Sequence, residues 1–407
     1  MKTETLFSQL LNLNSPFSVE RVIYKDREES DSPLHKSDKS VHIYISVETS
    51  SNHRPPNSKI HDYEQRTWRH LNLFQYPCYI HSKVPKYKNK QTGEVKTFEV
   101  PWSQPGIGFT LMFEQFAFEL VKLHGCVSEV AIQLCIYPQR LWRVIRDYAK
   151  ETSLENLDLS KVRRIGFDET SKKKGHEYIT CFIDLDTGEL LYIVEGKSAE
   201  VVSKFVTQAS QQGLDKEQVS DISIDMSPAF ISGVEKEFVN AQITVDKFHV
   251  SQLVQKGFDN IRKSFGRKQG GSINKWLFFT PYEQLKEEEQ QELDQLLVKY
   301  PLLDQVYEMK NAFKLLWEQP DKINASAFLS FWTETMRTFQ KRALTTLAKT
   351  LDKHHQRIIN VIDTEITNAI LEGFNSEIQT MKRKARGYKN VENLMTMIRL
   401  YCAKQPT

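Results

Sequence analysis

Three short segments of this chain share one pattern: an apolar residue, a small residue, a second apolar residue and then an aspartate. They are residues 165–168 (IGFD), 222–225 (ISID) and 243–246 (ITVD). Alternate residues of a strand face opposite ways, so the apolar pair can pack into one layer while the small residue and the aspartate share the other face. We expect three strands that end in these aspartates, each with space around its carboxylate.

The segments lie within residues 162–263, where strand-like and helix-like patterns alternate as in an α/β sheet. Residues 176–185 and 189–196 flank Gly188, which can supply a positive φ, so they predict a β-hairpin. The second and third aspartates are each followed by a helical pattern. Open α/β sheets commonly place their sites at the edge where such strands end.

The chain has 407 residues, too many for one ordinary core, and we expect two or three domains. The first 105 residues predict a small β module with strands at 41–47, 76–84 and 95–100. Residues 264–352 form a long and polar region with helical patterns. Three tryptophans of this region lie among apolar residues and are expected in its core: Trp276, Trp317 and Trp332.

Charge and composition exclude several classes of protein. The 55 Lys and Arg against 52 Asp and Glu give a formal net charge of +3, so DNA contacts must come from local basic patches and not from a polycationic surface. No segment has the character of a signal peptide or a membrane span, and no membrane partner is expected. Five scattered cysteines without a Cys-x-x-Cys indicate a reducing cytoplasm and no cysteine-based zinc site.

Asp168 and Asp225 are the first candidate metal ligands. Neighbouring strands would bring their carboxylates together near one edge of the sheet. The structural alternative is a helix cap, although Ser227 followed by Pro228 is a rival cap for the helix after Asp225. For Asp246 a cap is as good an interpretation as a functional role, because a helix begins directly after it.

Glu372 supplies a third carboxylate from the late helical pattern of residues 364–386, on the face opposite its apolar side. We expect it to meet Asp168 and Asp225 over the sheet edge. Three carboxylates bind hard cations such as Mg²⁺ or Mn²⁺, and a pair of ions can activate a hydroxyl nucleophile and stabilise the leaving oxygen in phosphoryl transfer. Alone, a helical glutamate is usually a solvated surface residue. Three further residues are candidates for positions beside the metal ligands: Asp246, Asn368 and Asn375.

A basic cluster follows the Glu372 helix and suits a phosphodiester substrate, whose flanking phosphates need cations. Its members are Lys382, Arg383, Lys384 and Arg386. The alternative is a solvated helix end whose cations complement the helix dipole.

A helix-turn-helix pattern covers residues 128–149. We expect Ser128 to cap the first helix, and Pro138 to begin the second. Apolar residues anchor both helices and leave three polar side chains facing a major groove: Gln139, Arg140 and Arg143. A structural helical hairpin would share this apolar spacing.

Five histidines of the β module have no ligand spacing and no second soft donor nearby, so metal binding is the minor interpretation and exposed strand positions the major one. They are His42, His53, His61, His70 and His81.

Several ordered motifs resemble the ISL-three family of bacterial insertion-sequence transposases. The resemblance is carried by GFDETSKKKGHEYITCFIDLDTGELL, DMSPAF, VDKFHV and NAILEGFNSEIQTMKRKARGYKN, and upstream by RTWRHLNLFQYPCYIHSKVPK. It implies a DDE catalytic domain with the triad on Asp168, Asp225 and Glu372. The family's N-terminal zinc module has paired cysteines that this sequence lacks, so zinc is not expected.

The resemblance also implies a fold class and its domain order. The fold is α/β, a ribonuclease-H-like mixed sheet with a helical insertion, preceded by a helix-turn-helix and a small β-rich module. The β-rich, degenerate zinc-finger-like module covers residues 1–105 and the helix-turn-helix covers 106–150. The catalytic domain covers 160–263 and 353–400, and the helical insertion covers 264–352.

The leading functional hypothesis is a DNA transposase that cleaves and transfers strands of an insertion sequence by two-metal phosphoryl transfer. Its partners would be double-stranded DNA, both the terminal inverted repeats and the target, and further copies of the chain on that DNA. The alternatives are a DNA-binding regulator of transposase descent without strand transfer and a Mg²⁺-dependent DNA nuclease. A cytoplasmic, nucleoid-associated bacterial protein is expected.

Overall fold

A computed structural model describes residues 2–26, 37–50, 53–151, 157–173, 177–268, 273–363 and 369–402. Contacts divide the chain into two compact units, one formed by residues 1–152 with 381–387 and the other by 153–380 with 388–407. Across the described ranges, no helix combines the length and the apolar character that crossing a bilayer requires.

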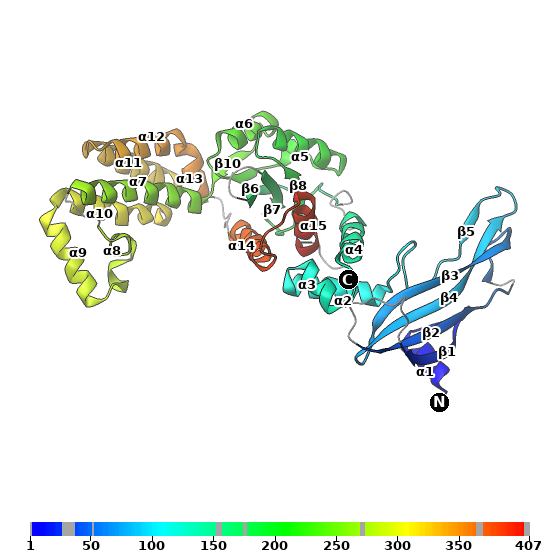
Figure 1. The fold of residues 1–407 in the computed structure, drawn as a ribbon. Helices are drawn as coiled ribbons and strands as arrows, with labels where there is room; N and C mark the ends of the chain where they lie inside the picture. The colour runs from blue at the N-terminus through cyan, green and yellow to red at the C-terminus, as the bar shows by residue number, and fades with distance from the viewer. Residues whose placement is uncertain are drawn as a thin grey trace. The chain divides into compact units, whose positions relative to one another are not determined.

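The first unit opens with α1 (Thr3–Leu10) and a five-stranded sheet in the order β1-β2-β4-β3, with β5 beside β4 (Figure 1). The strands are β1 (Phe17–Asp26), β2 (Lys39–Val47), β3 (Ser58–Leu73), β4 (Tyr76–Asn89) and β5 (Val95–Thr97). Among these five strands, β2 and β4 pair in parallel and the other pairs are antiparallel. Ile43, Trp68 and Ile80 are almost fully buried on one face. The predicted strands at 41–47 and 76–84 are confirmed, and the one predicted at 95–100 is shorter, ending at Thr97; β1 and β3 join them.

Three helices follow the sheet: α2 (Leu111–His124), α3 (Val127–Gln133) and α4 (Pro138–Glu151). The Thr110 hydroxyl accepts a hydrogen bond from the Phe113 amide at the start of α2, and Gly125 ends that helix with a φ of 72°. The expected cap at Ser128 is wrong, because α3 begins one residue earlier and Cys126 holds the cap position. The turn before α4 contains no glycine, and Cys135 takes the left-handed conformation there with a φ of 58°.

The second unit is built on a mixed five-stranded sheet in the order β10-β9-β6-β7-β8. Its strands are β6 (Arg164–Lys173), β7 (Glu177–Asp184), β8 (Leu190–Glu195), β9 (Asp221–Ile224) and β10 (Gln242–Val245). β9 pairs in parallel with both β6 and β10, whereas β7 is antiparallel to β6 and β8. Gly188 has a φ of 73° in the predicted hairpin, which is confirmed.

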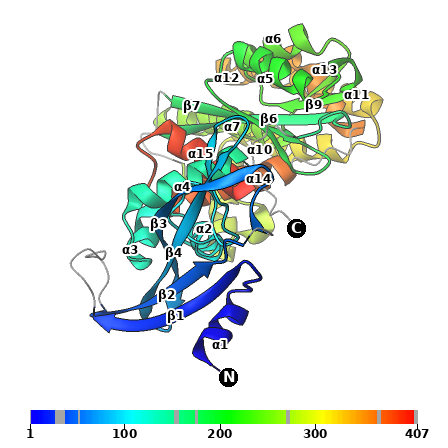
Figure 2. The same ribbon diagram turned by 90° about the vertical axis from the view of Figure 1, so that its right-hand side faces the viewer.

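Helices cover both faces of this sheet (Figures 1 and 2). α5 (Glu200–Gln211) and α6 (Pro228–Glu237) pack on the face where Ile165, Phe167 and Ile222 point. α14 (Ala369–Lys384) and α15 (Val391–Cys402) cover the other face. Four apolar residues of the repeated pattern therefore fill one layer, as predicted: Ile165, Phe167, Ile222 and Ile224. Ile243 packs against this layer, whereas Val245 belongs to the core of the helical region.

The helical region of this unit contains α7 (Lys247–Lys268), α8 (Lys275–Phe279), α9 (Glu287–Lys299), α10 (Pro301–Ala312), α11 (Lys322–Thr338), α12 (Arg342–Lys353) and α13 (His355–Asp363). Its core surrounds Trp332, whose indole donates to the Met309 carbonyl. Trp317 packs at the edge of that core. The expectation for Trp276 is wrong: this side chain is 63% exposed, because it lies on the outer side of the short helix α8.

Candidate active site

The register of the sheet brings the three aspartates of the repeated pattern into one row. Ile165 lies opposite Ile222, and Gly166 opposite Ser223, in the parallel β6–β9 pair. Continuing that register places Asp168 level with Asp225, on strands about 4.8 Å apart. The β9–β10 pair places Val245 opposite Ile224, so Asp246 follows level with Asp225 in the same way. Three carboxylates thus come from three adjacent strands.

One expectation about this row is wrong. Asp225 and Asp246 directly follow the last residues of their strands, but Asp168 lies in the middle of β6. The strand continues to Lys173 because its second half pairs with β7, where Thr180 lies opposite Glu169.

Asp168 is half-buried and tightly held. Its Oδ2 accepts a hydrogen bond of 2.7 Å from Asn375 Nδ2, and its Oδ1 accepts one of 2.7 Å from the Glu169 amide. Burial raises the pKa of Asp168 above its ordinary value, and the Asp225 carboxylate adds to the rise against the opposing effect of His249. A carboxylate in this position is stabilised when a cation approaches it.

Asp225 also organises the start of the following helix. Its Oδ1 accepts a hydrogen bond of 2.9 Å from the Ser227 amide, and Pro228 is the first residue of α6. The Ser227 hydroxyl makes no capping hydrogen bond. Ser227 therefore holds the predicted cap position before Pro228, but the side-chain hydrogen bond at this helix start comes from Asp225.

Both carboxylate oxygens of Asp246 contact the first turn of α7. Its Oδ1 accepts from the Phe248 amide at 2.7 Å, and its Oδ2 lies 3.2 Å from His249 Nδ1. The hydrogen bond to Asp246 raises the pKa of His249, and the carboxylates of Asp168 and Asp225 raise it further against the effect of burial. Asp246 therefore combines a capping role with the placement of an imidazole.

Two residues of this cluster were not predicted as site residues. His249 stands three residues after a strand-end aspartate, one helical turn along, and that spacing is the signal that could have identified it. Glu169 is half-buried beside the row; burial raises its pKa, while Lys197, 3.9 Å away, lowers it.

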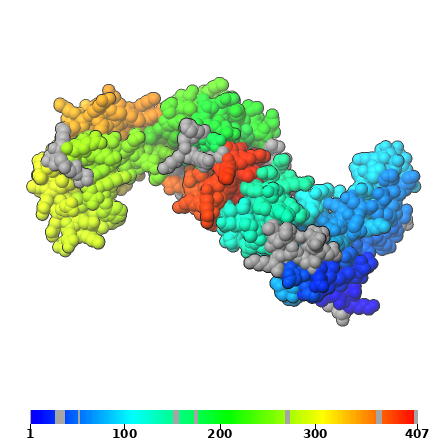
Figure 3. Space-filling view, in the orientation of Figure 1, coloured from blue at the N-terminus to red at the C-terminus, as the bar shows by residue number. Residues whose placement is uncertain are grey.

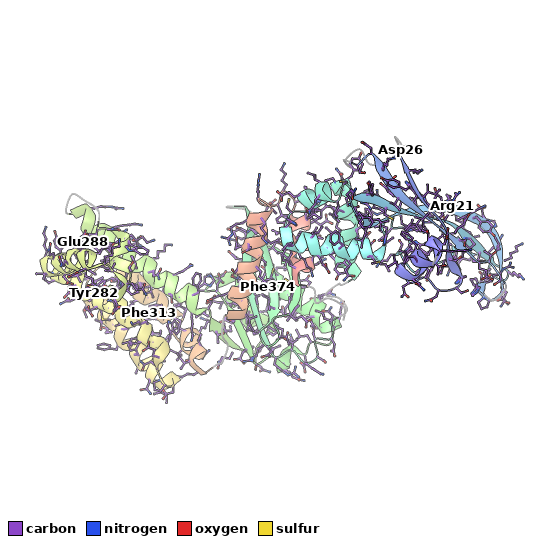
Figure 4. All side chains as sticks on the ribbon, turned by 90° about the horizontal axis from the view of Figure 1, so that it is seen from below. Arg21, Asp26, Tyr282, Glu288, Phe313 and Phe374 are labelled. Atoms are coloured by element: carbon purple, nitrogen blue, oxygen red, sulfur yellow. The ribbon has the colours of Figure 1, made fainter. Side chains whose placement is uncertain are left out.

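α14 lies directly over β6, which is how Asn375 reaches Asp168. A Cβ at Gly166 would stand 2.8 Å from Leu371 Cδ1, so the glycine is what allows this close approach. Figure 4 labels Phe374 on the same helix, where it is buried beside the sheet.

The structure does not bring Glu372 into the cluster. Its side chain is exposed in the first turn of α14, one turn before Asn375 and on the same face. Within the described part of the chain, no three His, Cys, Asp or Glu side chains are arranged to hold a metal ion. Asn368 lies outside the described residues.

The basic cluster at the end of α14 is not entirely solvated, because two of its lysines contact the protein or are partly buried. Lys384 Nζ donates to the Leu123 carbonyl at 2.8 Å, and burial lowers the pKa of the half-buried Lys382. Arg383 and Arg386 are exposed. The packing assigns residues 381–387 to the first unit, with the helix-turn-helix.

The predicted recognition residues are exposed on α4, at its first two turns: Gln139, Arg140 and Arg143. The Arg140 guanidinium lies 4.6 Å from the centre of the Phe109 ring. Arg143 Nε lies 4.0 Å from the Asp147 carboxylate, an exposed contact that contributes little.

The expectation of exposed strand histidines is wrong for His42, which is 4% exposed. Its Nδ1 lies 2.7 Å from His81 Nε2, in a cross-strand pair that the register of β2 and β4 creates. His70 lies 2.9 Å from the Thr110 hydroxyl, and burial lowers its pKa to about 4. Burial also raises the pKa of the Cys78 thiol to about 12.

Three family models match consecutive parts of the chain. The transposase model, of the DDE type of family ISL3, matches residues 165–398. The helix-turn-helix domain of transposase family ISL3 matches residues 99–149, and the zinc-finger of the transposases of IS204, IS1001, IS1096 and IS1165 matches residues 53–89. The zinc-finger match falls on β3 and β4, where paired cysteines are absent from the sequence.

Curated relatives agree over most of the chain. The transposase for insertion sequence element IS1001 of Bordetella parapertussis is 24% identical over 354 residues, which is 84% of this chain and 85% of the relative. The transposase for insertion sequence element IS1557 of Mycobacterium tuberculosis is 21% identical over 372 residues, 83% of this chain and 82% of the relative. With the family model spanning more than half of its length and including all three aspartates of the row, this chain belongs to the ISL3 family of transposases, enzymes of the DDE type that cleave and transfer DNA.

Proposed function

We propose that Asp168, Asp225 and Glu372 are the catalytic carboxylates of this transposase. One observation carries the proposal: α14, the helix of Glu372, is anchored on Asp168 through Asn375, while the sheet register places Asp225 beside Asp168. Glu372 precedes Asn375 by three residues, about 4.5 Å along the helix axis, on the same face. A short movement of this side chain and its turn would complete the triad.

The donor set fits Mg²⁺ or Mn²⁺. The residues supply oxygen ligands. The negative charge of Asp225 raises the pKa of Asp168, so a cation bound between the two carboxylates would stabilise their ionised forms. When bound, the divalent ions supply the Lewis acidity that activates a water or a 3′ hydroxyl and stabilises the leaving oxygen. The protein's own part is to hold Asp168 through Asn375 and the Glu169 amide, and to hold His249 beside the row through Asp246.

The finer architecture belongs to the same proposal. The mixed sheet with helices on both faces supports a ribonuclease-H-like catalytic domain over residues 160–263 and 353–400, with a helical insertion at 264–352. Residues 1–105 and 106–150 would be the β-rich and helix-turn-helix modules. We further propose that the chain acts as a homo-oligomer on its element ends and works in the bacterial cytoplasm at the nucleoid.

A direct test of the metal site uses Fe²⁺ in place of Mg²⁺. With ascorbate and peroxide, bound iron should cut the backbone near residues 168, 225 and 372, because hydroxyl radicals react close to where they form. Mg²⁺ in excess should suppress all three cuts together. Cuts near 168 and 225 without one near 372 would remove Glu372 from the metal site, and the absence of all three would reject the site.

A second prediction concerns recognition by α4. Arg140→Ala and Arg143→Ala should each weaken binding to element-end DNA by about 1 to 3 kcal/mol at one position of the sequence if the side chain reads a base. A phosphate contact would instead weaken binding to all sequences and reduce the salt dependence. Electrophoretic mobility shifts with DNA flanking the gene measure both, and Lys150→Ala, at the far end of α4, is the control. Unchanged affinity in both variants would make the segment a structural hairpin.

A third prediction concerns zinc in the N-terminal sheet. Protein purified without a histidine tag should contain well under one zinc per chain, since a structural site needs about four ligands and the Cys78 thiol is held protonated by burial. Metal analysis by mass spectrometry measures this. A stoichiometric content would instead point to a non-standard site among the histidines of the sheet and Cys78.

A further inference from the structure

A cavity of about 420 Å³ opens in the helical region of the second unit, away from the row of carboxylates. It lies between α7 and the segments around α8 and α10. Most of its lining residues fall within 279–317, a part of the chain that Figure 3 colours yellow. Figure 4 labels two of its lining residues, Tyr282 and Phe313. Its volume is in the range of pockets that hold a small ligand.

The walls of the cavity combine flat rings with amides. Phe279, Tyr282 and Trp317 line it, and all three are partly accessible to solvent. Gln255 and Asn311 add amide groups that can donate and accept hydrogen bonds. Aromatic rings stack on planar heterocycles, and they stack on any of the four DNA bases.

Two lysines, Lys310 and Lys314, line the cavity together with one carboxylate, Glu283, so positive charge is in excess. The Lys310 ammonium lies 4.1 Å from the centre of the Tyr307 ring and donates a hydrogen bond of 2.6 Å to the Phe278 carbonyl. Burial lowers its pKa to about 8, with a smaller opposing effect of Glu308. Lys314 is exposed at the same cavity. A half-buried ammonium held by rings and one carbonyl gains from an anion that enters beside it.

The position of the cavity relates it to the carboxylates. α7 begins directly after Asp246, and its residues Ser251 and Gln255 line the cavity about 8 to 14 Å further along the helix axis. Lys247, beside Asp246, lies with its ammonium 5.4 Å from the Trp317 ring centre. The start of α7 thus connects the row of carboxylates to the cavity.

We infer that this cavity binds one unpaired nucleotide of the DNA strand, with its base against the lining rings and its phosphate at Lys310 and Lys314. The inference rests on the proposed function, because it assumes that the DNA strand is cleaved at the nearby carboxylates. A nucleotide combines a planar base, hydrogen-bonding edges and a negatively charged phosphate. The rings, amides and lysines of the lining together match these three properties.

The test uses the full chain and a 12-residue oligothymidylate in EDTA, so that binding is measured without cleavage. Trp317→Ala and Lys310→Met should each weaken binding by about fivefold to a hundredfold, because stacking of one base on an aromatic ring contributes on this scale. Trp276→Ala and Lys299→Met are matched controls: Trp276 is exposed outside the cavity, and Lys299 lies on the Tyr300 ring. Wild-type affinity in both cavity variants, or equal losses in the controls, would overturn the inference.

A second measurement does not depend on how well the variants fold. The same oligonucleotide carrying 5-iodouracil should crosslink on irradiation to peptides that contain Tyr282 or Trp317, and free dTMP at millimolar concentration should compete. Crosslinks confined to other segments would reject the cavity. Because neither measurement requires cleavage, their failure leaves the catalytic proposal intact. Cleavage that survives in the Asp168, Asp225 and Glu372 variants, together with intact crosslinking, would reject only the catalytic proposal.

Discussion

Asp168→Asn, Asp225→Asn and Glu372→Gln should each reduce Mg²⁺-dependent cleavage of element-end DNA by about a thousandfold or more, which corresponds to roughly 4 kcal/mol of transition-state stabilisation. Each change removes one negative charge from the proposed ion site and keeps the size of the side chain. Fold and DNA affinity should remain close to wild type, because none of the three residues belongs to an apolar core. Gel analysis of end-labelled substrate measures cleavage, and circular dichroism checks the fold.

Glu377→Gln is the matched control, since Glu377 is exposed on the same helix as Glu372 but five residues further along, on another face. It should cleave as wild type does. Activity retained in any one triad variant would take that residue out of the triad. If Asn375→Ala abolished cleavage while Glu372→Gln did not, the helix would serve only to hold Asp168.

The site could be predicted from the sequence where it depends on local patterns. Alternation along a strand placed Gly166 and Asp168 on one face, and helical spacing placed Glu372 with Asn375. The length of β6 could not be predicted in this way. Its second half, residues 169–173, is polar and resembles a loop, and it is a strand only because β7 returns beside it.

Contacts that depend on long-range register were also missed. His42 and His81 are 39 residues apart, and nothing in the spacing shows that parallel pairing of β2 and β4 brings their rings together. Histidine is intermediate among residue types in its tendency to be buried, and here the pairing buries one of the two. The exposed Trp276 is the opposite case: apolar neighbours predict burial, but a short helix leaves one side open.

His249→Asn should lower the cleavage rate by about a hundredfold while preserving metal-dependent radical cutting near residues 168 and 225. The imidazole Nδ1 is engaged with Asp246, so a protonated ring can offer its Nε2 proton to a phosphate oxygen beside the carboxylates. Asparagine can keep the contact to Asp246 but has no donor in the Nε2 position. His355→Asn removes an imidazole on α13 that lies 2.8 Å from the Ser326 hydroxyl, and it is the control for loss of a histidine.

The pH dependence gives the sharper form of this prediction. Neighbouring carboxylates raise the pKa of His249 above its ordinary value of 6.5, so the ring is charged below that raised pKa and loses its charge as the pH rises through it. The advantage of wild type over His249→Asn should therefore be greatest near pH 6 and shrink toward pH 9, whereas ionisation of the attacking hydroxyl affects both proteins alike and cancels in the ratio. Single-turnover cleavage rates across this range measure it. A ratio that does not change with pH would show that His249 acts only by holding Asp246 in place.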